Sequence, residues 1–136
     1  MLNLNSACSG NDPVFYKYPA LLLTKFDTPL IGCEMGVAYG GGIEEIGKMW
    51  KGRGVIHGFD TFEGHPVQLA VTDNSDAAHA MDPHYAAHGK DILSYEYQRG
   101  ELDRQGLDNV VLHKGLIDEN SLKGISNLHY ALLDMD

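Results

Sequence analysis

Short apolar runs alternate along this chain with segments that have helical periodicity. Runs of about five apolar residues that stop at glycine or at an acidic residue are typical of buried parallel strands. We expect four such strands, at Leu30–Glu34, Val55–Asp60, Asn109–Leu116 and His129–Leu133. Between and before them the pattern predicts helices at Ile43–Lys51, Asp91–Arg104 and Ser121–Ile125, and a short helix or turn over Tyr18–Phe26.

The segment Ile43–Lys51 has the clearest helical pattern. Ile43, Ile46 and Trp50 fall on one face at spacings of three and four residues, and Gly52 stands where a glycine often ends a helix. Strands that alternate with helices indicate an α/β fold with a parallel sheet and right-handed crossovers. In such sheets, ligands bind beyond the carboxyl ends of the strands.

The domain organisation follows from the same pattern. Residues 1–29 form a lead-in segment, and residues 30–136 form one α/β domain. Within that domain, residues 67–90 are polar, acidic and rich in histidine, and we interpret them as a variable, lid-like insertion. Their histidines include His79, His84 and His88, which could form a zinc-like cluster, but Pro83 interrupts a helix there and a solvated segment is the favoured interpretation.

Composition excludes several classes of protein. The chain has 136 residues and a formal net charge of −9, so it lacks the basic cluster that nucleic-acid backbone binding needs. No apolar run approaches the roughly 20 residues of a membrane span. The first residues lack a signal-peptide pattern, and Cys8 and Cys33 lie far apart without metal-type spacing. We therefore expect a cytoplasmic protein with free thiols that binds neither membranes nor nucleic acid.

A glycine-rich turn follows the first strand. Gly36 comes directly after that strand, and Gly40-Gly41-Gly42 open the next helix. No Gly-Lys-Ser/Thr follows, so the turn is not a P-loop, and Ala38 stands where a Gly-x-Gly-x-x-Gly motif has its second glycine. Glu34 places an acidic group beside the turn, which suits a ligand with ammonium and sulfonium charge better than one with two phosphates. A plain strand-to-helix turn with a solvated glutamate remains the alternative.

An acidic residue also ends the second strand. Asp60 follows Gly36 by 24 positions, near the spacing at which nucleotide-binding sheets place a carboxylate that accepts hydrogen bonds from ribose hydroxyls. A role as a turn or helix cap is the alternative for Asp60. The next aromatic residue, Phe62, could line a pocket or the core.

Three stretches in order resemble a known family. Glu34-Met-Gly-Val-Ala-Tyr-Gly-Gly-Gly, His57-Gly-Phe-Asp-Thr-Phe-Glu-Gly-His-Pro66 and Tyr130-Ala-Leu-Leu-Asp-Met-Asp136 are similar to motifs of the macrocin O-methyltransferase family. The middle motif is the most specific, and the resemblance covers about residues 30–136. Thr61 replaces the family's usual serine. His65, in place of the usual leucine, and the polar segment 67–89 also depart from the family, and these two departures bear on the substrate more than on the cofactor. His65 could also act as a base.

The resemblance implies a Rossmann-like class I methyltransferase fold, of which this chain would be the N-terminal half, with parallel strands in the order 3-2-1-4. It implies S-adenosylmethionine as cofactor and a hydroxyl of a sugar or small metabolite as acceptor. The implied cofactor contacts are Glu34, Gly36, Tyr39, Gly40, Gly41, Asp60, Thr61, Phe62, Gly115 and Leu116. Leu116 and Ile117 could equally be core residues.

The same resemblance assigns the acidic end of the chain. Asp134 would be a catalytic base, and Asp134 with Asp136 would hold Mg²⁺, since paired carboxylates can ligate a divalent ion. The family brings further metal ligands from beyond the fourth strand, so a frayed acidic terminus is the alternative. Ending after strand four would also expose an apolar sheet edge, and we expect a second copy to cover it in a homodimer.

Three functions are thus distinguished. The first is an S-adenosylmethionine-dependent O-methyltransferase or a fragment of one. The second is a catalytically silent S-adenosylmethionine-binding or oligomerisation module. The third is a nicotinamide-dependent oxidoreductase, which the glycine spacing disfavours.

Overall fold

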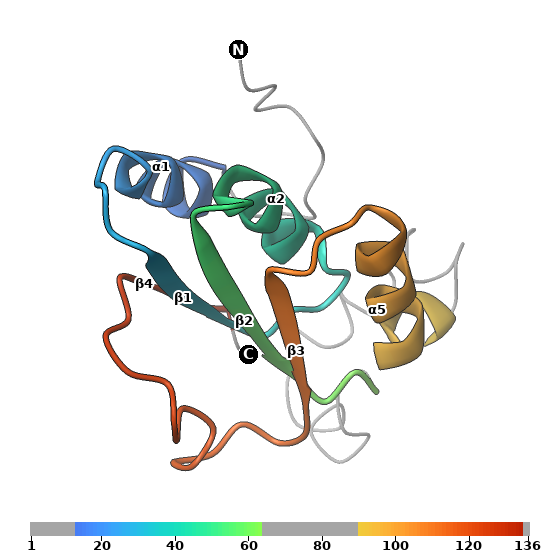
Figure 1. Ribbon diagram of the computed structural model, residues 1–136. Coiled ribbons are helices and arrows are strands. Elements are labelled where there is room, and N and C mark those ends of the chain that lie inside the picture. Colours follow the sequence, from blue (N-terminus) through green and yellow to red (C-terminus); the bar gives the residue numbers. More distant parts are fainter. Residues whose placement is uncertain (1–12, 64–89, 135–136) are drawn as a thin grey trace.

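The protein forms an α/β fold around a four-stranded sheet (Figure 1). The structure, a computed structural model, describes residues 13–63 and 90–134. The strands are β1 (Leu30–Met35), β2 (Gly54–Asp60), β3 (Val110–Lys114) and β4 (Tyr130–Leu133). All neighbouring pairs are parallel, and the order β3-β2-β1-β4 confirms the order expected from the sequence. This arrangement is compatible with a Rossmann-like fold.

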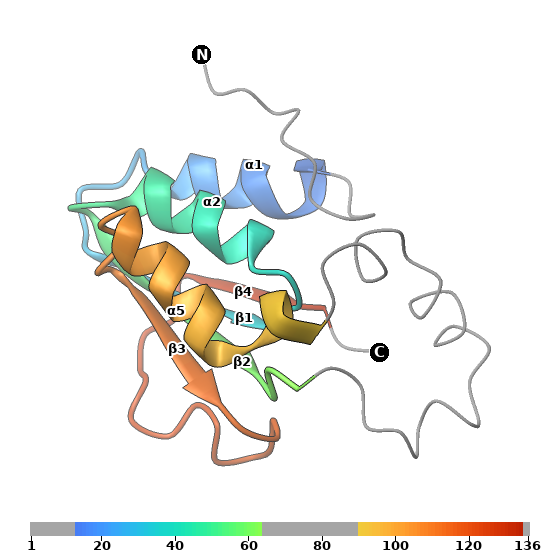
Figure 2. The ribbon, with the colours of Figure 1, turned by 90° about the vertical axis from the view of Figure 1, so that its right-hand side faces the viewer.

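Helices cover one face of the sheet (Figure 2). They are α1 (Pro13–Leu23), α2 (Gly41–Trp50) and α5 (Tyr95–Arg104), and a 3₁₀ turn, η1 (Lys90–Leu93), precedes α5. As predicted, α2 buries Ile43, Ile46 and Trp50 completely. Gly52 takes a left-handed conformation, with φ 75°, directly after its C-cap. No helix in the described part of the chain is long and apolar enough to cross a membrane.

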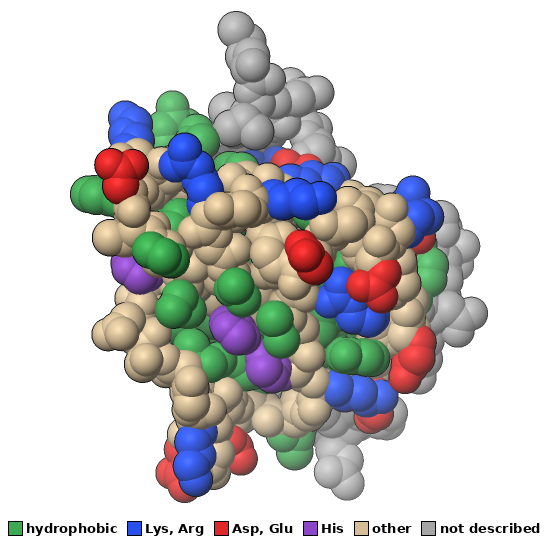
Figure 3. Space-filling model, viewed as in Figure 1, with side chains coloured by type: hydrophobic (Ala, Val, Ile, Leu, Met, Phe, Trp, Pro, Cys, Tyr) green, Lys and Arg blue, Asp and Glu red, His purple; other side chains and the backbone are tan. Residues whose placement is uncertain are grey.

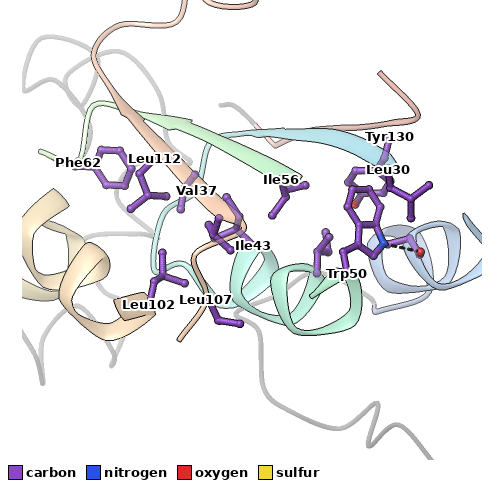
Figure 4. Close-up of a cluster of buried hydrophobic side chains, with 13 residues drawn as sticks. Leu30, Val37, Ile43, Trp50, Ile56, Phe62, Leu102, Leu107, Leu112 and Tyr130 are labelled. Carbon is purple, nitrogen blue, oxygen red and sulfur yellow. Dashed lines mark hydrogen bonds between the residues drawn. The ribbon is translucent and has the colours of Figure 1, made fainter. Parts of the chain in front are cut away.

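The main core lies between these helices and the sheet (Figure 4). Trp50 is its largest fully buried side chain, and its indole N–H donates to the carbonyl of Ala20 in α1 at 3.0 Å. The indole reaches the sheet only because residue 32 is glycine: a Cβ there would lie 2.8 Å from the Trp50 ring. Trp50 also meets Tyr130 of β4 edge to face, with ring centroids 5.8 Å apart. One side chain therefore joins α1, α2, β1 and β4.

The other face of the sheet has a smaller core. Cys33, Met35 and Phe59 are buried there, and the connection from β3 to β4 covers them with side chains of Ile117, Leu122, Ile125 and Leu128. Figure 3 shows histidine side chains next to hydrophobic ones near the centre of the molecular face in that view.

Three elements expected after residue 90 differ from the structure by more than one residue. The helix expected at Ser121–Ile125 is wrong: the segment forms successive turns, and Gly124, with φ 87°, breaks helical geometry there. The helix expected at Asp91–Arg104 is divided at Ser94, which has extended backbone and caps α5 by accepting from the N–H of Tyr97. The third strand ends at Lys114 rather than Leu116, because the chain turns away at Gly115.

The lead-in segment contains more helix than the pattern predicted. The α1 helix ends at Leu23 and begins at Pro13, ahead of the expected Tyr18, and Pro19 lies inside it. Its contact with α2 buries Lys17 and Ala20, and the ammonium of Lys17 lies 3.3 Å from the Glu45 carboxylate. This packing supports a helix that its internal proline would otherwise disfavour.

Candidate functional site

Three acidic residues meet at the carboxyl edge of the sheet. Glu34 lies in β1, Asp60 ends β2, and Asp134 follows β4. Backbone hydrogen bonds join the three strand ends: the N–H of Gly36 donates to the carbonyl of Phe59, and the N–H of Asp134 donates to that of Met35, both at 2.9 Å. The parallel sheet thus gathers carboxyl groups from positions 34, 60 and 134 at one place.

Asp60 connects two of these strand ends through its side chain. One carboxylate oxygen accepts from the backbone N–H of Val37 at 2.9 Å and of Ala38 at 3.0 Å. The other accepts from the N–H of Phe62 at 2.8 Å. The carboxylate therefore ties the turn after β1 to the turn after β2. The second oxygen also accepts a long hydrogen bond from the Thr61 hydroxyl at 3.4 Å, so a ligand hydroxyl would bind there in place of the Thr61 contact.

The turn after β1 is built from left-handed residues. Gly36 has φ 90° and Gly40, the N-cap of α2, has φ 80°. Glycine adopts these angles at little cost, but Ala38, between them, also has a positive φ of 47°. A non-glycine residue keeps such a conformation when its surroundings hold it there. Here the surroundings include the Asp60 carboxylate.

Glu34 is buried beneath the start of α2. Its side chain is 4% exposed, and its Oε2 atom has no hydrogen-bond partner. A Cβ on Gly42 would lie 2.8 Å from Oε1, so the helix can pass over the carboxyl only because residue 42 is glycine. Burial, followed by the charges of Asp134 and Asp60, raises the pKa of Glu34 to about 8. At neutral pH Glu34 is therefore largely protonated, so it brings neither an exposed oxygen nor a full negative charge to the site, in contrast to the acidic group expected beside the turn.

Gln98 of α5 is a site residue that the sequence analysis missed. It is 4% exposed, and its Nε2 atom donates to the carbonyl of Ala38 at 2.5 Å. A glutamine in a polar helix resembles a surface residue, so no pattern distinguishes it. The one available signal is its position in the first turn of a helix that begins at the same sheet edge.

The structure brings most of the expected site residues to one edge. Glu34, Gly36 and Asp60 adjoin as described, and Gly115 joins them because its N–H donates to the Asp60 carbonyl at 2.9 Å. Phe62 belongs to the core, 4% exposed and packed edge-on against Tyr95. Leu116 is 78% exposed rather than buried. Of the remaining expected contacts, Tyr39 and Gly40 lie in the turn after β1, Gly41 is the first residue of α2, and Thr61 lies in the turn after β2.

Other expected features cannot be placed in the structure. Asp136, the second expected magnesium ligand, lies outside the described residues, as do His65 and the histidine-rich part of the expected insertion. Among residues 13–63 and 90–134, no group of three histidine, cysteine or acidic side chains is arranged to hold a metal ion. Lys114 ends β3, and its ammonium lies 3.3 Å from the Glu63 carboxylate.

Comparison with known protein families gives no match to this chain, and comparison with curated proteins gives none either.

Proposed function

We propose that this chain binds S-adenosylmethionine at the carboxyl edge of its sheet and belongs to a cytoplasmic O-methyltransferase of the macrocin O-methyltransferase type. The acceptor would be a hydroxyl of a sugar or another small metabolite. A class I methyltransferase fold has the strand order seen here and places its cofactor at this edge.

The observation that carries the proposal is that the Asp60 carboxylate accepts hydrogen bonds from backbone N–H groups in the turn after β1. A dinucleotide needs free backbone N–H groups at this turn to bind its pyrophosphate. Here the N–H groups of Val37 and Ala38 already donate to a carboxylate of the protein. The N–H groups of Gly36 and Gly40 donate to the carbonyls of Phe59 and Val37. The turn itself therefore has little capacity for phosphate, which would have to bind to the N–H groups of the first turn of α2 instead.

The charge of the same edge favours a cationic ligand. Burial, and after it the charges of Asp134 and Asp60, raises the pKa of Glu34, so the two aspartates lie near enough to act on the same site. A negatively charged pyrophosphate would be repelled there, whereas an ammonium or sulfonium group would be attracted. These charges favour S-adenosylmethionine over a nicotinamide cofactor.

For methyl transfer to a hydroxyl, the protein has to bind the two substrates and remove the hydroxyl proton. S-adenosylmethionine supplies a methyl group on positively charged sulfur, and its transfer to oxygen leaves a neutral thioether. Asp134 is exposed at the edge, where its carboxylate could accept the proton of an acceptor hydroxyl. Asp60 would position the ribose through its second oxygen. The Asp134–Asp136 magnesium site remains a prediction, and so does a homodimer formed at the outer edge of β4, which pairs with no further strand among the described residues.

Calorimetric titration tests the cofactor directly. We expect S-adenosylhomocysteine to bind to the full chain and NAD⁺ not to bind. Binding of NAD⁺ alone, or of neither ligand at millimolar concentration, would contradict the proposal.

Methyl transfer tests the enzyme. Radiolabelled S-adenosylmethionine is incubated with sugar and small-metabolite hydroxyl acceptors, with and without Mg²⁺. We expect Asp134→Asn to lose transfer but to keep S-adenosylhomocysteine binding, while the matched exposed variant Asp108→Asn keeps both. Ligand binding without transfer to any acceptor would instead favour the silent binding module.

A further inference from the structure

The first turn of α5 contacts both turns of the candidate site. Tyr95 packs edge to face against Phe62, with ring centroids 5.5 Å apart. Gln98, three residues later, donates its side-chain amide to Ala38. Residues three apart lie on the same face of a helix, so one helical surface holds the turn after β1 and the turn after β2.

Both of the contacted residues have unusual backbone conformations. Ala38 has φ 47° and Phe62 has φ 54°, although neither is glycine. Residues in this region are strained unless several contacts hold them, and such residues concentrate at functional sites. Both backbone polar groups of Ala38 are hydrogen-bonded: its N–H donates to the Asp60 carboxylate, and its carbonyl accepts from the Gln98 amide.

The neighbours of Gln98 fix the orientation of its amide. Its Nε2 atom faces three backbone carbonyls, those of Ala38 at 2.5 Å, Ile92 at 3.4 Å and Leu93 at 3.5 Å. Three acceptors at one position require the nitrogen there, which leaves Oε1 on the other side. That oxygen is buried without a hydrogen-bond partner and faces Gly40, where a Cβ would lie 2.8 Å away.

We propose that Gln98 is a positioning residue of the cofactor site, whose amide fixes the left-handed turn from Ala38 to Gly40. The inference rests on the proposed function, because that turn would form one wall of the S-adenosylmethionine site. Gln98 is buried and acts through Ala38 and Gly40. A preformed turn binds its ligand more tightly, since less ordering is left to occur on binding.

The test replaces the amide by a carboxyl of nearly the same shape. Gln98→Glu loses the donor and places an acceptor against three carbonyls, so we expect S-adenosylhomocysteine to bind about tenfold more weakly. Gln105→Glu is the matched control, because Gln105 is the C-cap at the opposite end of the same helix. We expect its dissociation constant to stay within about twofold of wild type.

A second comparison separates positioning from general loss of stability. Leu102→Ala removes a buried side chain from the same helix, so it should lower the thermal midpoint. Measured well below every midpoint, its affinity for S-adenosylhomocysteine should remain that of wild type. Equal losses of affinity in Leu102→Ala and Gln98→Glu, or none in the latter, would overturn the proposal.

Amide hydrogen exchange in the ligand-free chain distinguishes this inference from the proposed function. If wild type does not bind S-adenosylhomocysteine, the cofactor assignment fails, but the amides of Val37 and Ala38 still report on the turn. We expect about tenfold faster exchange at both amides in Gln98→Glu and no change in Gln105→Glu. If Gln98→Glu does not fold, the apolar Gln98→Met replaces it in both measurements. Unchanged exchange would refute the positioning role whatever the ligand.

Discussion

The Asp60 carboxylate accepts a hydrogen bond from the backbone N–H of Val37 at 2.9 Å. This contact joins the end of β2 to the turn after β1, so the turn's conformation depends on an acidic side chain 23 residues away in sequence. It also gives Asp60 two roles, one in holding the turn and one, by proposal, in binding ribose. Variants of Asp60 should therefore change stability as well as ligand affinity.

Asp60→Asn should destabilise the protein even without ligand. The asparagine oxygen can still face Val37 and Ala38, but its NH₂ group then meets the N–H of Phe62, which loses its acceptor. We expect the free energy of unfolding to fall by about 1–3 kcal/mol, as measured by urea denaturation. Asp108→Asn, an exposed change of the same type, should be neutral. The same loss in both variants would contradict the structural role of Asp60.

Two glycines in helices should respond to alanine with opposite signs. A Cβ on Gly47 of α2 would lie 2.4 Å from a methyl group of Val110, so Gly47→Ala should destabilise by about 1–3 kcal/mol. Gly100 of α5 has no atom within 4 Å of its Cβ position, so Gly100→Ala should stabilise by about 0.5–1 kcal/mol. Urea denaturation measures both. A stabilising Gly47→Ala would show that α2 does not pack on β3 in this way.

The sequence predicts this fold best where the pattern of apolar side chains is compatible with only one kind of element. The apolar face of α2 and the strand order follow from periodicity and from the resemblance. The division at Ser94 was missed because Asp91–Arg104 has near-helical spacing throughout, and a cap depends on local backbone geometry. The helix at Ser121–Ile125 was wrong because apolar residues that cover a sheet face from turns can have helical spacing.

The candidate site also has features that the sequence predicts and features that it does not. Parallel topology places Gly36 and Asp60 at one edge, so their proximity is predictable from strand boundaries alone. The contacts made by Asp60 and Gln98 with backbone atoms are not predictable, because backbone donors and acceptors leave no trace in side-chain identity. Burial of Glu34 likewise depends on the absence of a Cβ at Gly42, which becomes evident only when the helix is placed on the strand.

Glu34 should make the stability of the protein fall as pH rises. Its pKa is about 8 in the folded state, above the ordinary value of 4.5. Between these two values the unfolded chain has lost the proton that the folded chain keeps, so folding becomes less favourable with rising pH. Glu34→Gln stays neutral and should be more stable than wild type at pH 8, with a difference that shrinks towards pH 5. Urea midpoints at several pH values measure this. A constant difference, or one matched by exposed Glu119→Gln, would contradict it.

The pair formed by His57 and His113 should act in the opposite direction. Their ring nitrogens lie 2.9 Å apart, which requires one nitrogen to donate and the other to accept. Burial and then the charge of His113 lower the pKa of His57, and burial lowers that of His113. Below about pH 6.5 the unfolded chain binds protons that the folded pair does not bind, so this pair's contribution to stability is lost as pH falls.

Because Glu34 contributes the opposite slope at acidic pH, the comparison is made in the Glu34→Gln background. Adding His113→Phe there should reduce the loss of stability between pH 7 and pH 5.5, as followed by urea midpoints. An unchanged loss would mean that the two imidazoles do not share a single proton on this face of the sheet.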